Sequence, residues 1–226
     1  MDHRDQLFEK WNQWLDVIKN DVTNLSVSRH IFWEVQNIIK ANPKIQLASS
    51  FYEWMGPAYA VFQSIGLRRQ IDRRKDVISF HRLLEEIVRR PGVISRERYV
   101  ALYEEPVIRK HIADKAFDKF AGAGKRHINS GIVRKDRDQL IKKIDGMKDY
   151  VDKRIAHFAQ QGPTRLPTYG DIDDCLDFVE TLLIKYLAVL RAEVWTGVLP
   201  TWQYDWKQIF RHPWIPSNNM MRRKQP

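Results

Sequence analysis

The stretch 136–158 places one apolar side chain on nearly every turn of a helix. Five residues mark this stripe at spacings of 4, 3, 4 and 4: Leu140, Ile144, Met147, Val151 and Ile155. Such spacing is the signature of an amphipathic helix that buries one face, and Phe158 returns to the same stripe. Gly162 and Pro163 follow it, and proline cannot continue a helix. We therefore predict a central helix that reaches Phe158.

The same periodicity recurs along the whole chain and predicts an all-α fold. Apolar stripes indicate further helices over about 7–25, 28–39, 50–74, 79–88 and 168–196, with shorter ones after Ser95 and Pro106. Ser28, Ser79 and Ser95 are each expected to cap a helix, and Thr168 with Asp171 to form a capping box for the last. The helix after Pro106 is expected to bury Ile112 and Phe120. The stripe of the last helix consists of Ile172, Leu176, Val179, Leu183, Tyr186, Leu187 and Leu190. No run of residues alternates as a half-buried strand does. We expect a bundle of long antiparallel amphipathic helices.

Two of these stripes are strongly apolar and are expected to face the core. The stripe of the second helix consists of Ile31, Phe32, Val35, Ile38 and Ile39. The stripe of the third helix consists of Phe51, Met55, Ala58, Phe62 and Ile65. Since a surface helix normally turns its apolar side inward, we predict that both stripes are buried.

The chain divides into three parts by composition. Residues 1–197 carry the helical pattern and are predicted to form a single all-α domain. Residues 198–216 are rich in Trp and Pro, and Trp202, Trp206 and Trp214 are expected to hold this extension against the body. Residues 217–226 are polar and basic, which predicts a disordered tail.

Composition excludes several classes of protein. Hydrophobic residues make up 43% of the 226 residues, so the chain can bury a sizeable core. Its apolar runs are too short to cross a bilayer, and its charged start is unlike a signal peptide. Cys175 is the only cysteine, which excludes an internal disulfide and fits a reducing compartment. We expect a cytoplasmic protein without a membrane segment.

The formal net charge of +10 favours polyanionic partners, nucleic acid above all, although a merely basic soluble protein has the same composition. One basic cluster spans residues 68–75, where Arg69 can pair with Asp72 along the helix. A second contains Lys125 and Arg126 in a glycine-rich loop. Each cluster is either a phosphate contact or a solvated basic surface.

Neither a metal nor a cofactor is expected. The carboxylates within 171–177 begin a helix, where the helix dipole favours them, and their spacing fits no calcium loop. Gly122, Gly124 and Lys125 lack the spacing, the following hydroxyl and the preceding strand of a phosphate-binding loop. The seven histidines form no HExxH motif and no Cys/His pairing.

His157 and Arg154 carry the strongest chemical signal. Three residues apart on a helix, they lie about 60° from each other on the flank of the apolar stripe, beside Tyr150 and Lys143. An imidazole titrates near neutral pH and can move the proton of a ribose hydroxyl, while a guanidinium stabilises developing phosphate charge. The alternative is structural, because a histidine near a helix end often caps carbonyl groups or pairs locally.

The motif DKRIAH (152–157) ends the predicted central helix. Two further stretches accompany it: 68–79 with the Leu-Leu helix that follows, and LPTYGDIDDCLDFVE (166–180) leading to KYLAVL (185–190). Over roughly residues 5 to 195 the chain resembles the HEPN superfamily (higher eukaryotes and prokaryotes nucleotide-binding), in particular its AbiU-like abortive-infection branch. The resemblance implies an all-α bundle and, for many members, a metal-independent endoribonuclease whose site forms across a homodimer.

The family motif is an arginine followed, after four to six residues, by a histidine. His157 matches the histidine, but the positions that could hold the arginine are occupied by Tyr150, Val151 and Asp152. Arg154, three residues before His157, is the candidate substitute. The resemblance implies His157 as the acid/base group and Arg154 as the phosphate ligand.

Two functions follow. The first is an RNA-binding and RNA-cleaving protein of bacterial defence or toxin–antitoxin type, with His157 and Arg154 catalytic. Its predicted RNA contacts are Arg69, Lys153, Lys125 and Arg126. The second is a catalytically inactive helical interaction or scaffold module, in which His157 and Arg154 tie the central helix to Asp72 or to a neighbouring helix.

Asp72, Tyr150 and Asp152 are expected to have supporting structural roles under either function. The expected partners are RNA, a second copy of the chain, and an antitoxin or another protein. A DNA-binding regulator is a weaker third option, because no pair of helices joined by a short glycine-containing turn is visible.

Overall fold

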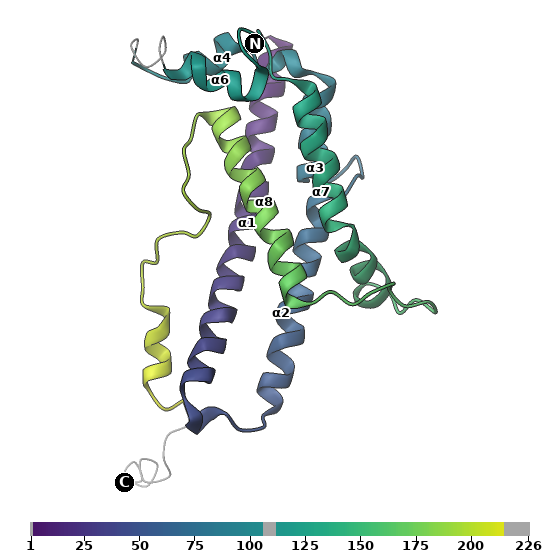
Figure 1. The fold of residues 1–226 in the computed structure, drawn as a ribbon, viewed down its shortest axis with the longest axis vertical. Coiled ribbons are helices and arrows are strands. Elements are labelled where there is room, and N and C mark those ends of the chain that lie inside the picture. Colours follow the sequence, from purple (N-terminus) through teal and green to yellow (C-terminus); the bar gives the residue numbers. More distant parts are fainter. Residues whose placement is uncertain (1, 106–111, 215–226) are drawn as a thin grey trace, which may run out of the picture.

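The computed structural model describes residues 2–105 and 112–214, and the fold is all-α, as predicted (Figure 1). The long helices are α1 (His3–Ala41), α2 (Ser50–Gln70), α7 (Ser130–Tyr150) and α8 (Tyr169–Arg191). The shorter helices are α3 (Phe80–Arg89), α4 (Arg96–Ala101) and α6 (Asp114–Ala121). Single helical turns form at η1 (Pro43–Ile45), η2 (Pro91–Val93), η4 (Val151–Ile155) and η5 (Trp206–Arg211). No described helix is long and apolar enough to cross a membrane.

Helix α1 is one continuous element of 39 residues, so the prediction of two helices divided at Ser28 is wrong. The sequence between Leu25 and Ile31 contains neither glycine nor proline, and nothing in it therefore breaks the helix. The hydroxyl of Ser26 donates a 2.9 Å hydrogen bond to the carbonyl of Val22 one turn back. A serine can satisfy its hydroxyl in this way within a helix interior, and does not need a helix end.

Helix α2 presents an unexpected face to the core. Its buried residues are Gly56, Tyr59, Gln63, Ser64, Gly66, Leu67 and Gln70. The predicted buried face is wrong at Phe51 and Phe62, which are exposed, while Met55, Ala58 and Ile65 are half-buried. A Cβ atom on Gly66 would lie only 2.4 Å from Leu25 of α1, so glycine permits the close approach of these helices. Gln63 adds a hydrogen bond of 2.8 Å to the Leu25 carbonyl.

The predicted caps of three helices are confirmed. The Ser79 and Ser95 hydroxyls accept hydrogen bonds from the backbone N–H groups three residues later and begin α3 and α4. Thr168 and Asp171 form the capping box of α8. Helix α8 ends at Arg191, earlier than predicted, because Ala192 adopts a left-handed conformation with φ of 55°.

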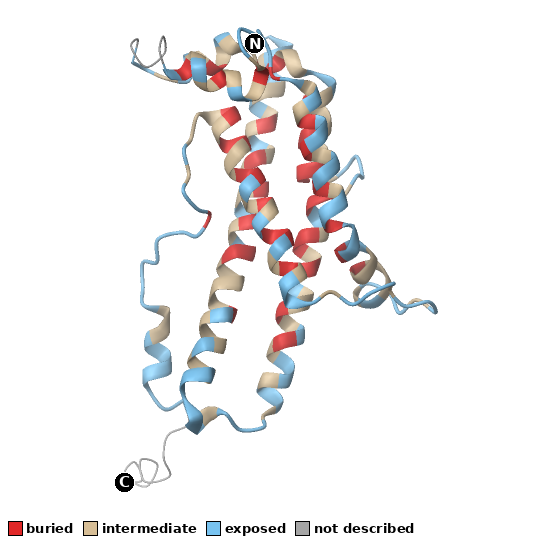
Figure 2. Ribbon diagram, viewed as in Figure 1, coloured by how far each residue is buried: buried red, intermediate tan, exposed pale blue. Residues whose placement is uncertain are grey.

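Helix α8 lies at the centre of the bundle, against α1, α2 and α7 (Figure 1). Ten of its residues are buried, including the whole predicted stripe from Ile172 to Leu190. Figure 2 shows the buried residues gathered in the half of the bundle that contains α8, α3 and α7. The other halves of α1 and α2 diverge toward η1 and are largely exposed or half-buried.

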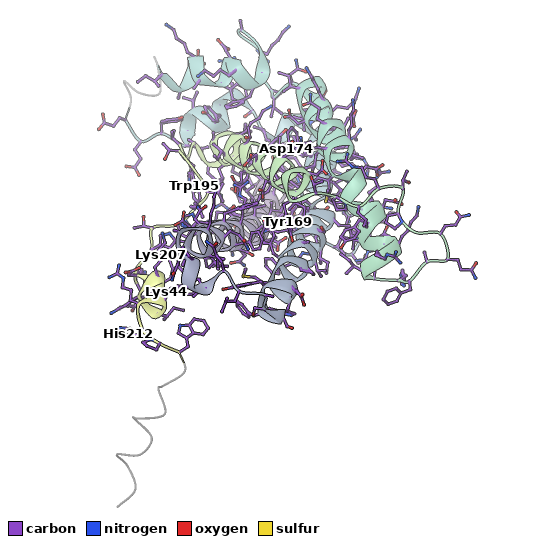
Figure 3. The ribbon with its side chains drawn as sticks, turned by 60° about the horizontal axis from the view of Figure 1, so that its bottom comes forward. Lys44, Tyr169, Asp174, Trp195, Lys207 and His212 are labelled. Carbon is purple, nitrogen blue, oxygen red and sulfur yellow. The ribbon has the colours of Figure 1, made fainter. Side chains whose placement is uncertain are left out.

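The segment after α8 runs along the outside of α1 and carries η5 (Figure 1). The rings of Trp202 and Trp206 lie 5.6 and 6.2 Å from the ring of His30, and Lys207 forms an ion pair with Glu34 (Figure 3). Trp214 is 64% exposed. Residues 217–226, predicted to be a basic tail, lie outside the described residues.

The helix predicted to begin at Pro106 falls partly on residues 106–111, which are also outside the described part of the chain. Ile112, which was expected to be buried in that helix, is 59% exposed. Helix α6 instead buries Phe117 and Ala121, with Phe120 packed at the margin of the core.

A buried carboxylate joins α7 to α8. Asp136 accepts hydrogen bonds from the Tyr186 hydroxyl at 2.9 Å and from Lys185 Nζ at 2.6 Å. Burial, together with the neighbouring carboxylate, raises the pKa of Tyr186, so its hydroxyl stays protonated and continues to donate. The charge of Asp136 is balanced by Lys185, which makes this contact a paired and hydrogen-bonded buried charge.

Replacing this carboxylate is expected to destabilise the fold. Asp136→Ala leaves the buried Tyr186 hydroxyl and Lys185 without their acceptor, which should lower the free energy of unfolding by about 2 kcal/mol. Asp138→Ala on the same helix is the control, because Asp138 is mostly exposed and its loss should cost less than about 0.5 kcal/mol. Urea unfolding followed by circular dichroism measures both. Equal losses would contradict a specific role for Asp136.

Candidate functional site

The predicted catalytic pair lies at the end of the central helix, where the helix is irregular. Helix α7 ends at Tyr150, and Val151–Ile155 form a π-helical turn, η4. His157 follows this turn in an extended loop, so the prediction that the helix reaches Phe158 is wrong. Phe158 is 88% exposed. A π-helical turn advances the chain by a different angle per residue than an α-helix, and the angular positions counted along an ideal helix therefore do not hold beyond Val151.

The structure does not assemble His157 and Arg154 into a supported pair. Both side chains are exposed, and no hydrogen bond or ion pair joins either of them to another described residue. A general acid/base group needs a partner that fixes its orientation within hydrogen-bonding reach of the reacting atom. The geometry of this chain alone provides no such partner. Tyr150 is half-buried at the last position of α7.

Asp72 and Asp152 are joined by Arg68 instead. The guanidinium of Arg68 donates to Asp152 at 2.8 Å and to Asp72 at 3.0 Å, which ties α2 to η4. Burial acts to raise the pKa of both carboxyl groups, but hydrogen bonds from cations outweigh this effect and lower the pKa of each. Arg74 and Arg68 donate to Asp72. Lys148 and Arg68 donate to Asp152. The predicted tie of Asp72 to His157 or Arg154 is therefore wrong, because Arg68 holds that position.

Two of the four predicted RNA contacts are held in ion pairs. The sequence indicates a pair between Arg69 and Asp72, but in the structure Arg69 pairs with Asp21 of α1. Lys153 pairs with Asp149 at 2.7 Å. Their charges are thus partly neutralised within the fold, and each is a weaker phosphate contact than an unpaired cation.

Lys125 and Arg126 lie at the opposite end of α7. Both are exposed in the loop between α6 and α7. The 21 residues of α7 separate this loop from η4 by about 30 Å. The predicted cluster with Lys125 and Arg126 therefore does not form one surface with His157.

A hollow of about 460 Å³ lies beside η4, but its charges balance. Its wall includes three carboxylates, Asp145, Asp149 and Asp152, and three cations, Lys148, Lys153 and Arg165. Such a wall has no net attraction for a polyanion. A neighbouring hollow contains Cys175, but burial raises the pKa of this thiol to about 11, so the thiol is protonated and is not a nucleophile. No group of residues within the described ranges could hold a metal ion.

An apolar surface lies between the diverging halves of α1 and α2. A groove of about 540 Å³ is lined by side chains of both helices. Its walls include Val27, Ile31, Val35, Trp54, Met55 and Phe62, and we call this surface the apolar groove. Phe32 and Tyr59, which also line it, stack with ring centroids 3.9 Å apart. None of the described residues that line the groove is charged.

The exposure of these side chains is the departure from prediction that matters most for function. Trp54 is 63% exposed and Phe62 is 45% exposed. The sequence identified the stripes of α1 and α2 correctly as apolar, yet no described element covers them on this side of the helix pair. The missed signal was the second stripe of α2, Gly56, Gln63, Gly66 and Gln70, whose small and amide residues pack against α1 and α8.

The Arg68 bridge and the predicted catalytic pair should differ in their effect on stability. Arg68→Ala removes the bridge between Asp72 and Asp152 and should cost about 1–2 kcal/mol. Arg154→Ala and His157→Ala should each change stability by less than about 0.5 kcal/mol, because both side chains are exposed. Thermal unfolding at neutral pH measures these changes. A loss in either of the last two variants as large as in the first would contradict this assignment.

The loss of stability in Arg68→Ala should depend on pH. The pKa values of Asp72 and Asp152 are lowered in the fold, so their stabilising effect is present above their unfolded pKa and is lost as pH falls. The difference between the parent and Arg68→Ala should therefore shrink between about pH 5 and pH 2. An undiminished difference at the lower pH would show that the carboxylates do not carry the effect.

Comparisons with known proteins identify no relative of this chain, so any function is argued from its own residues. No family model, no curated protein and no solved structure matches the chain. The resemblance to the HEPN superfamily stays a prediction that rests on its short motifs.

Proposed function

We propose that this protein is a helical interaction module that acts as a homodimer, with a second copy of the chain covering the apolar groove. The observation that carries this proposal is the orientation of α2. Its glycine and glutamine residues face the core, while its apolar stripe, which includes the exposed Phe51 and Phe62, faces outward. Exposed apolar patches of this kind mark interaction surfaces. Fully burying one large apolar side chain is worth about 1.5–3 kcal/mol, so covering the groove is strongly favourable.

A second copy fits the shape of the groove. The groove is formed by an antiparallel pair of helices, and two such pairs placed face to face form a four-helix bundle. A two-fold axis sets α1 of one copy against α2 of the other, so that each apolar stripe meets another apolar stripe. Large aromatic side chains that become buried in an interface, here Trp54 and Phe62, are among the residues that contribute most to binding.

The distribution of charge also supports self-association at this surface. Two copies that each carry a formal charge of +10 repel one another over most of their surfaces. Uncharged walls make the apolar groove a surface where copies can approach without placing like charges in contact. The resemblance to the HEPN superfamily implies a homodimer as well.

The non-catalytic part of the proposal is supported by the separation of the predicted site residues. His157 and Arg154 are exposed and have no partner among the described residues. Arg69 is paired with Asp21, and Lys125 and Arg126 lie at the other end of α7. Arg68 holds the two carboxylates near η4 in a structural bridge. These contacts suit a scaffold better than an active site.

Sedimentation velocity tests the dimer directly. The parent should sediment as a dimer that dissociates on dilution within a range of about 1–100 μM. Trp54→Lys should remain folded and become monomeric over this range, because it places a charge in the apolar wall of the groove. Trp214→Lys is the matched control, since Trp214 is as exposed as Trp54 at 64% against 63%, and it should leave the dimer intact.

Two results would contradict the proposal. A parent that stays monomeric throughout would show that the groove does not serve self-association, whichever other protein it binds. Equal weakening of the dimer by both lysine variants would show that the contact lies outside the groove. Circular dichroism of each variant establishes that the helices persist.

The absence of catalysis has its own test. Total RNA is incubated without metal ions with the parent or with His157→Ala at equal concentrations. We expect the same RNA pattern from both proteins, because His157 lacks an orienting partner in the fold. Cleavage by the parent that disappears in the variant would establish a ribonuclease and contradict the scaffold proposal.

A further inference from the structure

A second cavity, unrelated to the apolar groove, lies where α3 packs on α7. Its volume is about 500 Å³, which is within the usual range for small-ligand sites. Its charged lining consists of Arg73, Lys75, Arg82, Arg89 and Arg137, with Glu85 as the carboxylate. Five cations and one carboxylate give a formal charge of +4 when the lining histidine is neutral. We call this the cationic cavity.

The lining histidine is a buried polar group without a partner. His81 is only 5% exposed, and its Nδ1 atom has no hydrogen-bond partner among the described residues. Burial lowers the pKa of His81, and the nearby Arg73, Arg137 and Arg82 lower it further, against the opposing effect of Glu85. The ring is therefore neutral near pH 7. Unpaired buried polar groups are uncommon in proteins and point to a missing partner.

Three of the five cations already have acceptors within the fold. Arg89 pairs with Glu85 at 2.8 Å, and Arg137 donates to the exposed Asp138 at 2.8 and 3.0 Å. Arg82 donates to a backbone carbonyl and lies 3.7 Å from Glu86, which already accepts two hydrogen bonds from Lys10.

The two cations at the cavity rim, Arg73 and Lys75, have the fewest partners. Arg73 and Lys75 are exposed and form no ion pair with a described residue. They come from the loop between α2 and α3, opposite Arg137 of α7. Cations from three separate segments thus converge on one hollow, which is the electrostatic arrangement that concentrates anions.

We propose that the cationic cavity binds a compact oligophosphate, that is, several phosphate groups held close together. Arginine guanidinium groups match phosphate oxygens with paired hydrogen bonds, and four of the five cations here are arginines. A single phosphate could contact only some of these cations. Ile141 is the only apolar residue among the described lining residues, and the ring of His81 is only 5% exposed, so the wall recognises phosphate groups and offers little ring surface to a base.

The phosphates can belong to a free oligophosphate or to a nucleic-acid strand, and the chemistry of recognition is the same. Inorganic tripolyphosphate is the direct probe of that chemistry. ATP should bind no more tightly than tripolyphosphate, because the cavity has no stacking surface for adenine. A single-stranded oligoribonucleotide distinguishes the two sources, since it displaces tripolyphosphate only if the cavity accepts a strand.

His81 links this binding to pH. The charged groups that face it are Arg82 and Glu85 on α3, Arg73 in the loop before α3, and Arg137 on α7. A bound polyanion offsets the repulsion from the three arginines, which raises the pKa of His81 in the complex. Binding is then coupled to proton uptake and strengthens as pH falls.

Isothermal titration calorimetry at low salt tests the proposal on the full chain. The parent should bind tripolyphosphate more tightly than inorganic phosphate. The double variant Arg73→Gln/Lys75→Gln should weaken tripolyphosphate binding by about tenfold or more. The matched control Lys125→Gln/Arg126→Gln removes the same charge from another exposed loop and should change affinity by less than about twofold. All four side chains are exposed, so both variants should fold.

The outcomes are decisive in each direction. Loss of affinity in the first variant alone, with proton uptake that disappears in His81→Gln, supports the site. If His81→Gln fails to fold, the proton uptake of the parent in buffers of different ionisation enthalpy gives the same information. No binding of tripolyphosphate, or equal weakening in both double variants, overturns the proposal and leaves only the general attraction of a basic surface.

Discussion

The burial of α8 is the interaction on which the rest of this structure depends. Its ten buried residues cover more than a single stripe, as expected for a helix surrounded by others. Helices α1, α2 and α7 are arranged around it, and the polar contacts at its edges fix how they sit. Arg29 of α1 binds Glu180 at 2.8 and 2.9 Å, and Asp136 of α7 binds Tyr186. Apolar burial supplies the stability, and these paired charges fix the register of the helices.

The helical stripes and the caps could be predicted from the sequence because both depend on local chemistry. The stripe of α8, the hydroxyl caps of α3 and α4 and the capping box at Thr168 each require only residues a few positions apart. The same locality explains the errors. Whether a stripe is buried depends on what packs against it, and the apolar pattern alone does not show that α2 uses Gly66 and Gln63 to contact α1.

The candidate sites were harder to predict than the fold. The DKRIAH motif suggested a helix flank, but the π-helical turn at Val151–Ile155 changes the geometry there. Arg68 binds Asp72, the carboxylate that His157 and Arg154 were expected to meet. The cationic cavity joins residues separated by more than fifty positions, from Arg73 to Arg137. Only Arg73 and Lys75 belonged to a cluster visible in the sequence, because charge clusters report neighbours along the chain and not across helices.

The unequal lengths of the helices give the molecule a mechanical character. Helix α1 has 39 residues and α8 has 23, so they are about 58 and 35 Å long. Contacts between α1 and α8 extend from Asn12, which accepts from Arg191, to Trp33, which donates to Asp173 at 2.8 Å. The end of α1 beyond Trp33, the η1 turn and the first turns of α2 therefore form an arm that reaches past α8 (Figure 1). A force on the tip of this arm is carried by the contacts of α1 with α2 and with η5, where Lys207 pairs with Glu34, and not by the central helix.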